Sequence, residues 1–250
     1  MMIRALVRPP SSVFSRCISS HPDHHSLNLS HAREQHTAYC SALSELGLEV
    51  IALPEDEIHP DSCFVEDTAV VVGSRAFITR MAEESRRGEE EEVLRVLEQY
   101  MSVRSATPPA TIEGGDIIHL DDRLISGITQ RTNKEGVDQM TAWLDVSSDL
   151  VEDKSVIHLK SHVTYIGRNT IVVTEPFSNH PVLQDFAKVV VPHEERYAAN
   201  ALAIGETVLM SAGHPQTQVM VSELGFEVQP LRMSEFEKCE GALTCLSILF

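Results

Sequence analysis

The stretch Thr68-Ala-Val-Val-Val-Gly-Ser-Arg-Ala-Phe-Ile-Thr79 holds two short runs of branched and aromatic residues, which the pair Gly73-Ser74 separates. This pattern is typical of a β-hairpin, because a tight two-residue turn joins two antiparallel strands. Beyond the hairpin, Val93, Leu97 and Tyr100 follow one another at helical spacing. The local order is therefore predicted to be strand, strand and helix.

The same order recurs along the chain. Further hairpin turns are expected at Asp121-Asp122-Arg123, Gly167-Arg168-Asn169 and Gly205-Glu206. Strands are expected at residues 3–8, 49–53, 68–72, 76–79, 117–120, 124–128, 164–166, 171–174, 188–191, 202–204, 208–211 and 226–230. Helices are expected around Leu43, Val93, Val137, Leu183 and Val221, with a cap at Thr132 or Asn133 for the third. Their centres recur every ~35 to 55 residues, a period typical of propellers and repeat arrays. The pattern predicts one α/β domain over residues 1–250, with a hairpin, a helix and another strand used about five times.

Composition limits the classes of function. A formal net charge of −17 argues against binding to nucleic acid, whose phosphates need a basic face. No apolar run reaches the roughly 20 residues that span a bilayer. The five cysteines include no Cys-x-x-Cys pair and favour a reducing, cytoplasmic location over a disulfide framework. Arginines and serines near the start resemble a transit peptide, but the alternation in residues 3–8 favours a first strand.

Three residues are candidates for catalysis. Cys245 precedes the final apolar run and is either a small buried hydrophobe or a thiolate nucleophile. His158 lies in an apolar stretch and is either a packed histidine or a general acid and base. Glu113 precedes Gly114-Gly115, where it either lies in a solvated turn or orients His158 as a buried carboxylate.

Carboxylates and arginines in short turns suggest the ligand. Asp61, Glu66 and Asp67 surround apolar residues, and buried acids need a cation. A planar guanidinium suits paired carboxylates. By the reverse complementarity, Arg86 and Arg131 would clamp a carboxylate, unless each forms an ion pair within the chain. The set predicts a small cationic substrate that also carries a carboxylate.

Cofactor signals are weak. The stretch His21-Pro22-Asp23-His24-His25 matches no closed metal site and is interpreted as a loop. No Gly-rich phosphate loop or dinucleotide fingerprint occurs in the sequence. We therefore expect neither a metal nor an organic cofactor, while the histidines leave zinc binding by this loop open.

Taken together, these segments resemble the dimethylarginine dimethylaminohydrolases of the guanidino-group-modifying (pentein) superfamily. Phe64-Val65-Glu66-Asp67, Ser85-Arg86-Arg87 and the C-terminal cysteine carry the likeness in that order, within a resemblance over almost the whole chain. The resemblance implies a five-bladed α/β propeller of ββαβ units around a central active site. It also implies the following site residues: Cys245, His158 and Glu113 for catalysis, Asp61, Glu66 and Asp67 around the guanidinium, Arg86 and Arg131 on the substrate carboxylate, and Ile18 on an N-terminal flap (residues 17–29).

The implied activity is hydrolysis of Nω-methylated arginine, either asymmetric dimethylarginine or monomethylarginine. The products would be citrulline and dimethylamine or methylamine, formed through a covalent cysteine thiouronium. The alternatives are an arginine deiminase or another guanidine hydrolase, and, from another class, a non-catalytic propeller that serves as a binding module. The expected partner is a small molecule, with no nucleic acid and no membrane; a homodimer is compatible with this interpretation.

Overall fold

Five three-stranded sheets make up the computed structural model, which describes residues 3–250. In each sheet the first strand runs antiparallel to the second, and the second runs parallel to the third. The strands, sheet by sheet from first to third, are β15 (Ile248–Leu249), β1 (Arg4–Val7) and β2 (Glu49–Ala52); β3 (Ala69–Val72), β4 (Arg75–Ile78) and β5 (Ser102–Ser105); β6 (Ile117–His119), β7 (Leu124–Ile128) and β8 (Ser148–Glu152); β9 (Val163–Gly167), β10 (Thr170–Thr174) and β11 (Ala187–Val191); β12 (Leu202–Ile204), β13 (Thr207–Ser211) and β14 (Glu227–Leu231). This is the five-bladed α/β propeller that the sequence predicted.

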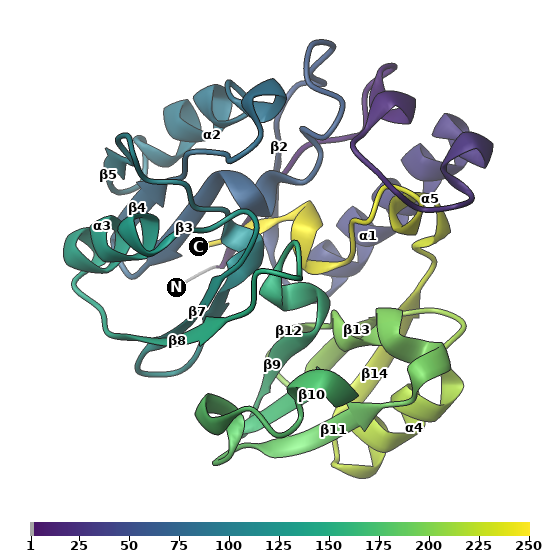
Figure 1. Ribbon diagram of the computed structural model, residues 1–250. Coiled ribbons are helices and arrows are strands. Elements are labelled where there is room, and N and C mark those ends of the chain that lie inside the picture. Colours follow the sequence, from purple (N-terminus) through teal and green to yellow (C-terminus); the bar gives the residue numbers. More distant parts are fainter. Residues whose placement is uncertain (1–2) are drawn as a thin grey trace.

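Helices make the parallel crossovers. In four blades α1 (Leu29–Glu45), α2 (Glu90–Leu97), α3 (Lys134–Leu144) and α4 (Pro215–Glu223) join the second strand to the third. Figure 1 shows α2, α3 and α4 on the outside of their sheets. In the blade of β10, two 3-10 turns, Glu175–Phe177 and Pro181–Leu183, replace the predicted helix. A short helix, α5 (Ser234–Glu237), follows β14.

The two ends of the chain share one blade. Ala5 of β1 pairs with Leu249 of β15, and Arg4 and Phe250 exchange backbone hydrogen bonds of 2.6 and 2.9 Å. The two ends of the described chain consequently lie side by side near the middle of the molecule (Figure 1). This pairing brings the residues just before β15, Cys245 among them, to the inner end of a blade.

Local signals explain much of the architecture. The side chain of Asn133 accepts the N–H of Gly136 at 2.8 Å, which satisfies one free donor at the start of α3 and confirms Asn133 as the cap. Val93 and Leu97 of α2 are fully buried against Leu6, Ile78 and their neighbours. Burying each such side chain contributes about 1.5–3 kcal/mol. No helix within residues 3–250 combines the length and apolar character needed to cross a membrane.

Three strands and one cysteine pair differ from the sequence-based expectation. β5, β8 and β15 were not predicted, because the first two are largely polar edge strands and the third has two residues. The expectation of unpaired cysteines is wrong for Cys17 and Cys239, which form a disulfide with Cα atoms 5.9 Å apart. Cys40, Cys63 and Cys245 are free thiols in the described chain.

Candidate active site

A 3-10 turn precedes the first strand of every blade. The five turns are η3 (Val65–Thr68), η5 (Gly114–Asp116), η6 (Leu159–Ser161), η9 (His193–Ala199) and η10 (Thr244–Leu246), which precede β3, β6, β9, β12 and β15. Turn η3 contacts both η10 and η5, and η6 contacts both η5 and η9. Residues at equivalent points of the repeats therefore meet at one centre.

His158 and Glu113 face each other across this centre. His158 Nε2 lies 2.7 Å from Glu113 Oε2 and 3.7 Å from Asp67 Oδ1. Glu113 is fully buried, and its other oxygen accepts the backbone N–H of Ala82 at 3.0 Å. A Cβ on Gly115 would lie 2.9 Å from the His158 ring, so only glycine fits behind the imidazole. The structure thus brings the predicted pair together and fixes the ring.

The electrostatic surroundings keep His158 protonated. Burial alone would lower the pKa of His158, because it disfavours the charged imidazolium. The negative charge of Asp67 and the hydrogen bond that the imidazolium donates to Glu113 outweigh burial and raise the pKa to about 9. The imidazole can therefore donate a proton at neutral pH.

Arg86 lies inside this acidic cluster. Its guanidinium forms a fork with Glu89 at 3.0 and 2.9 Å, and Nη1 donates to Asp67 Oδ2 at 2.9 Å. Burial would raise the pKa of Asp67, but His158 and Arg86 hold that pKa below its usual value. Arg86 thus forms the ion pairs within the chain that the sequence left open as the alternative to a substrate clamp. Its contact with a substrate carboxylate stays a prediction.

Arg131 is placed differently. It is 9% exposed, and its Nη1 lies 3.2 Å from Glu83 Oε1. Within residues 3–250 this buried nitrogen makes no hydrogen bond of acceptable geometry. Glu83 is half exposed, so Arg131 retains donor capacity for an incoming carboxylate.

The turn of Cys245 is tied to neighbouring blades. Asn200 Oδ1 accepts the N–H of Thr244 at 3.0 Å, and Asn200 Nδ2 donates to the carbonyl oxygen of Lys160 at 3.1 Å. Thr244 Oγ1 donates to Glu66 at 2.7 Å, and Lys160 Nζ lies 2.6 Å from the other Glu66 oxygen. These bonds fix the positions of η10, η6 and η3 relative to one another.

Cys245 is half-buried in acidic surroundings. Burial raises the pKa of the Cys245 thiol, and the charges of Glu66 and Asp67 raise it further, whereas Lys160 opposes them. The resting group is therefore a neutral thiol. Deprotonation becomes favourable once a cation enters these surroundings.

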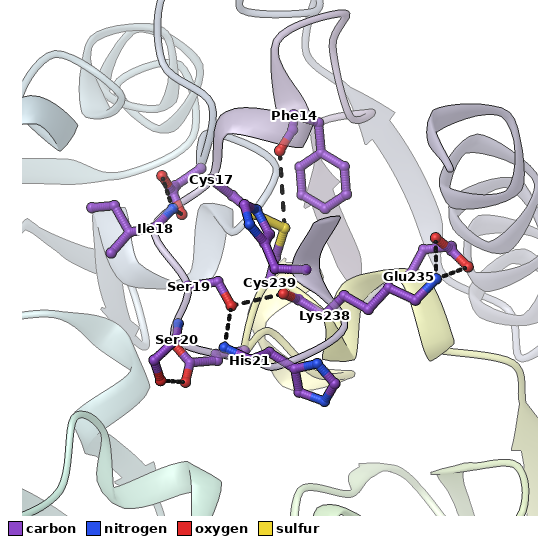
Figure 2. The surroundings of a disulfide bond; sticks show 12 residues. Phe14, Cys17, Ile18, Ser19, Ser20, His21, Glu235, Lys238 and Cys239 are labelled. Carbon is purple, nitrogen blue, oxygen red and sulfur yellow. Dashed lines mark hydrogen bonds and ion pairs between the residues drawn. A yellow bond between two sulfur atoms is a disulfide. The ribbon is translucent and has the colours of Figure 1, made fainter. Parts of the chain in front are cut away.

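Asp61 links the site to the flap. Its buried carboxylate accepts the backbone N–H of Ile18, with 3.2 Å to each oxygen. Burial raises the pKa of Asp61, an effect that Arg86 and Arg131 only partly offset. The Ile18 side chain is 40% exposed, and Figure 2 shows it directed away from the disulfide.

A cavity of about 440 Å³ extends along the first strands of the blades. Glu66, Lys160 and Thr244 line it, whereas His158, Glu113 and Cys245 do not. The catalytic candidates therefore lie outside the lining of this cavity, whose wall includes the Glu66–Lys160 ion pair.

Two groups within residues 3–250 bring three potential metal ligands within 4.8 Å. The first, Asp67, Glu113 and His158, already contains a protonated imidazole and lies against Arg86, so it needs no metal for charge balance. The second, Cys17, His24 and Cys239, has its two sulfurs in a disulfide. The expectation that the protein needs no metal stays a prediction.

Sequence reasoning missed several residues that build the site. They are Lys160, Thr244 and Asn200, which anchor the Cys245 turn, and Asp116, which accepts hydrogen bonds from Thr129 Oγ1 and the Leu159 N–H, both at 2.8 Å. Asp116 follows Gly114-Gly115 and is fully buried. The repeat period could have found these residues, since each lies within four residues of the first strand of its blade.

The chain is similar to known hydrolases in both sequence and fold. Residues 14–190 match the family model described as N,N dimethylarginine dimethylhydrolase, eukaryotic. The N(G),N(G)-dimethylarginine dimethylaminohydrolase of Pseudomonas aeruginosa is 37% identical, over 97% of this chain and 96% of that protein. A solved structure of that bacterium's enzyme, a cysteine-to-serine variant with citrulline, has a TM-score of 0.95, 34% identity and 100% coverage of both chains. A cyanobacterial arginine dihydrolase domain, with a TM-score of 0.91 and 20% identity over 100% of this chain and 97% of that one, shares the fold.

Proposed function

Because the chain belongs to the dimethylarginine dimethylaminohydrolase family of hydrolases, we propose that it hydrolyses Nω-methylated arginine. Asymmetric dimethylarginine would give citrulline and dimethylamine, and monomethylarginine would give citrulline and methylamine. One observation carries the proposal: turn η3, which holds the carboxylates of Glu66 and Asp67, contacts the turn of a free cysteine, Cys245. Such a cluster stabilises a planar cation next to a nucleophile.

The two ends of the substrate meet different surroundings. Asp61, Glu66 and Asp67 would surround the guanidinium. The raised pKa values of Asp61 and Glu66 indicate that burial penalises their charged forms, and a bound cation would relieve that penalty. At the other end, the free donor capacity of Arg131 suits the α-carboxylate. Ile18 on the flap and Arg86 complete the proposed binding set.

Catalysis would begin with the thiol. The positive charge of the bound guanidinium lowers the cost of ionising Cys245, whose proton passes to solvent. The thiolate forms a bond to the guanidinium carbon, and the carbon–nitrogen bond to the methylated amine breaks as protonated His158 donates its proton to that amine. A covalent thiouronium remains on Cys245.

Water completes the cycle. His158, now neutral and oriented by Glu113, removes a proton from water, whose oxygen attacks the thiouronium carbon. The carbon–sulfur bond breaks, citrulline leaves and Cys245 is released. The cycle uses only side chains of the described chain and one water molecule.

Arginine is the nearest competing substrate, because the same residues would serve its hydrolysis and the leaving group differs only by methyl groups. A citrulline-release assay on arginine, monomethylarginine, and asymmetric and symmetric dimethylarginine tests the proposal. We expect the highest kcat/KM with asymmetric dimethylarginine or monomethylarginine, and no citrulline from a Cys245→Ser control. A higher kcat/KM with arginine would indicate that the protein is an arginine deiminase instead. Absence of citrulline from every substrate would refute it.

A further inference from the structure

The flap (residues 17–29) docks on a segment from the other end of the chain, residues 235–240, which we call the docking segment. Ser19 Oγ donates to the carbonyl oxygen of Lys238 at 2.7 Å, and Ser20 donates through its N–H and hydroxyl to Glu240 at 3.2 and 2.7 Å. The N–H of Asn28 donates to Glu235 at 2.7 Å. Several polar bonds thus hold the two segments together, and Figure 2 shows those around Ser19 and Ser20.

The Cys17–Cys239 disulfide crosses this same contact. Cys17 belongs to the flap and Cys239 to the docking segment, and they are 4% and 3% exposed. Cys17 directly precedes Ile18, whose N–H binds Asp61 of the candidate site. Cys239 lies on the segment that leads into the turn of Cys245. A covalent bond here holds the flap against the site in a way that the polar bonds alone cannot.

The surroundings of the disulfide contain groups suited to thiol chemistry. His24 Nε2 lies 3.4 Å from Cys17 Sγ, close enough to donate a proton to that sulfur. Cys239 Sγ lies 3.9 Å from the carbonyl oxygen of Phe14, an acceptor for a thiol hydrogen (Figure 2). Each sulfur therefore has a partner in the reduced state as well as in the bonded one.

We propose that Cys17 and Cys239 form a reversible thiol–disulfide exchange site, whose reagents are small dithiols and small disulfides, and that the bond locks the flap over the candidate site. Disulfides in reducing compartments are mostly transient, catalytic or redox-sensing, so reversibility reconciles this bond with the reducing location expected from composition. The exchange itself is independent of the proposed function; an effect on turnover rests on it.

A small dithiol would reduce the disulfide in two steps. A thiolate of the dithiol attacks Cys239 Sγ, the sulfur–sulfur bond breaks, and Cys17 leaves as a thiolate that accepts a proton from His24. The second thiol of the reagent then attacks the mixed disulfide and releases Cys239 as a thiol. The dithiol loses two electrons and becomes a cyclic disulfide. A small disulfide reverses the reaction by accepting two electrons from the protein thiols.

The first test counts thiols. The parent chain is incubated with oxidised glutathione, denatured, alkylated and mapped by mass spectrometry, with and without prior dithiothreitol. We expect alkylation of Cys40, Cys63 and Cys245 alone before reduction, and of all five cysteines after it. His24→Ala should slow the reduction without changing its end point. Alkylation of Cys17 and Cys239 in the oxidised sample would overturn the proposal.

The second test measures access to the site. Cys245 of the native chain is alkylated with a haloacetamide in the oxidised state, and in the reduced state after removal of dithiothreitol. We expect alkylation at least about tenfold slower in the oxidised state, and no such difference in a Cys239→Ser control. Equal rates in both states of the parent would overturn the locking role. If the two alkylation rates differ but no methylated arginine is hydrolysed, the proposed function is wrong, whereas the locking of the flap by the disulfide is still supported.

Discussion

Alkaline pH should destabilise the fold through one side chain, His158. This side chain is only 14% exposed, and its Nε2 lies between Glu113 and Asp67. Their carboxylates raise its pKa from 6.5 to about 9 despite burial. Because one pKa unit corresponds to about 1.4 kcal/mol, the charged imidazolium contributes about 3 kcal/mol to folding. The folded-state pKa is the higher one, so this contribution is complete below pH 6.5 and is lost as the pH rises through about 9.

A matched variant isolates that contribution from other titrating groups. His158→Gln keeps an amide donor near the position of Nε2 but carries no charge at any pH. Urea unfolding of both proteins, followed by circular dichroism, gives their free energies of unfolding at about pH 6 and about pH 10. We expect the advantage of the parent over the variant to shrink by about 3 kcal/mol between these two values. A constant difference across the range would refute the assignment of a protonated His158 to the folded state.

Four further predictions each concern a single position. Cys245→Ser should lower citrulline release below ~10⁻³ of the parent rate with an unchanged Tm, because a hydroxyl is far less acidic than a thiol; scanning calorimetry checks the fold. Arg131→Ala should raise KM about tenfold at similar kcat, which steady-state kinetics would measure. Arg86→Ala should lower the free energy of unfolding by about 3–5 kcal/mol, because it leaves Asp67 and Glu89 buried without their partner. Urea unfolding would measure this loss. Gly115→Ala should reduce kcat, because the new Cβ would lie 2.8 Å from Asp67 Oδ1 and 2.9 Å from the His158 ring; kinetics on folded protein test it.

The parts of the fold that sequence predicts are those with local causes. β3 is a run of branched residues, β4 ends in Phe77 and Ile78 after a tight turn, and α3 begins at an Asn133 cap, so these patterns are readable without knowledge of the rest. β5 and β8 are polar because they lie at sheet edges, and only pairing with β4 and β7 makes them strands. The two-residue β15 exists because the other end of the chain provides its partner.

In the candidate site, too, some features can be predicted from local sequence and others only from the fold. The residues alone left the roles of Glu113 and His158 open and the family resemblance implied the pair, whereas the fold places the two side chains 2.7 Å apart. Arg86 was ambiguous: its sequence position suits both a substrate clamp and an internal ion pair, and only the fold shows Glu89 forked against it. The partners of the disulfide are 222 residues apart, and nothing local in either segment predicts that they meet.

The acidic surroundings of Cys245 look unfavourable for a nucleophile, since Glu66 and Asp67 oppose formation of a thiolate. Under the proposed function the same acids become an advantage. They admit a cation, and the cation offsets their field at the sulfur, so the thiolate forms mainly when substrate is present. Citrulline is neutral at the ureido carbon and gives no such compensation, so the sulfur regains its proton once the product forms. Coupling ionisation to substrate charge thus keeps the resting thiol unreactive and favours release of the neutral product.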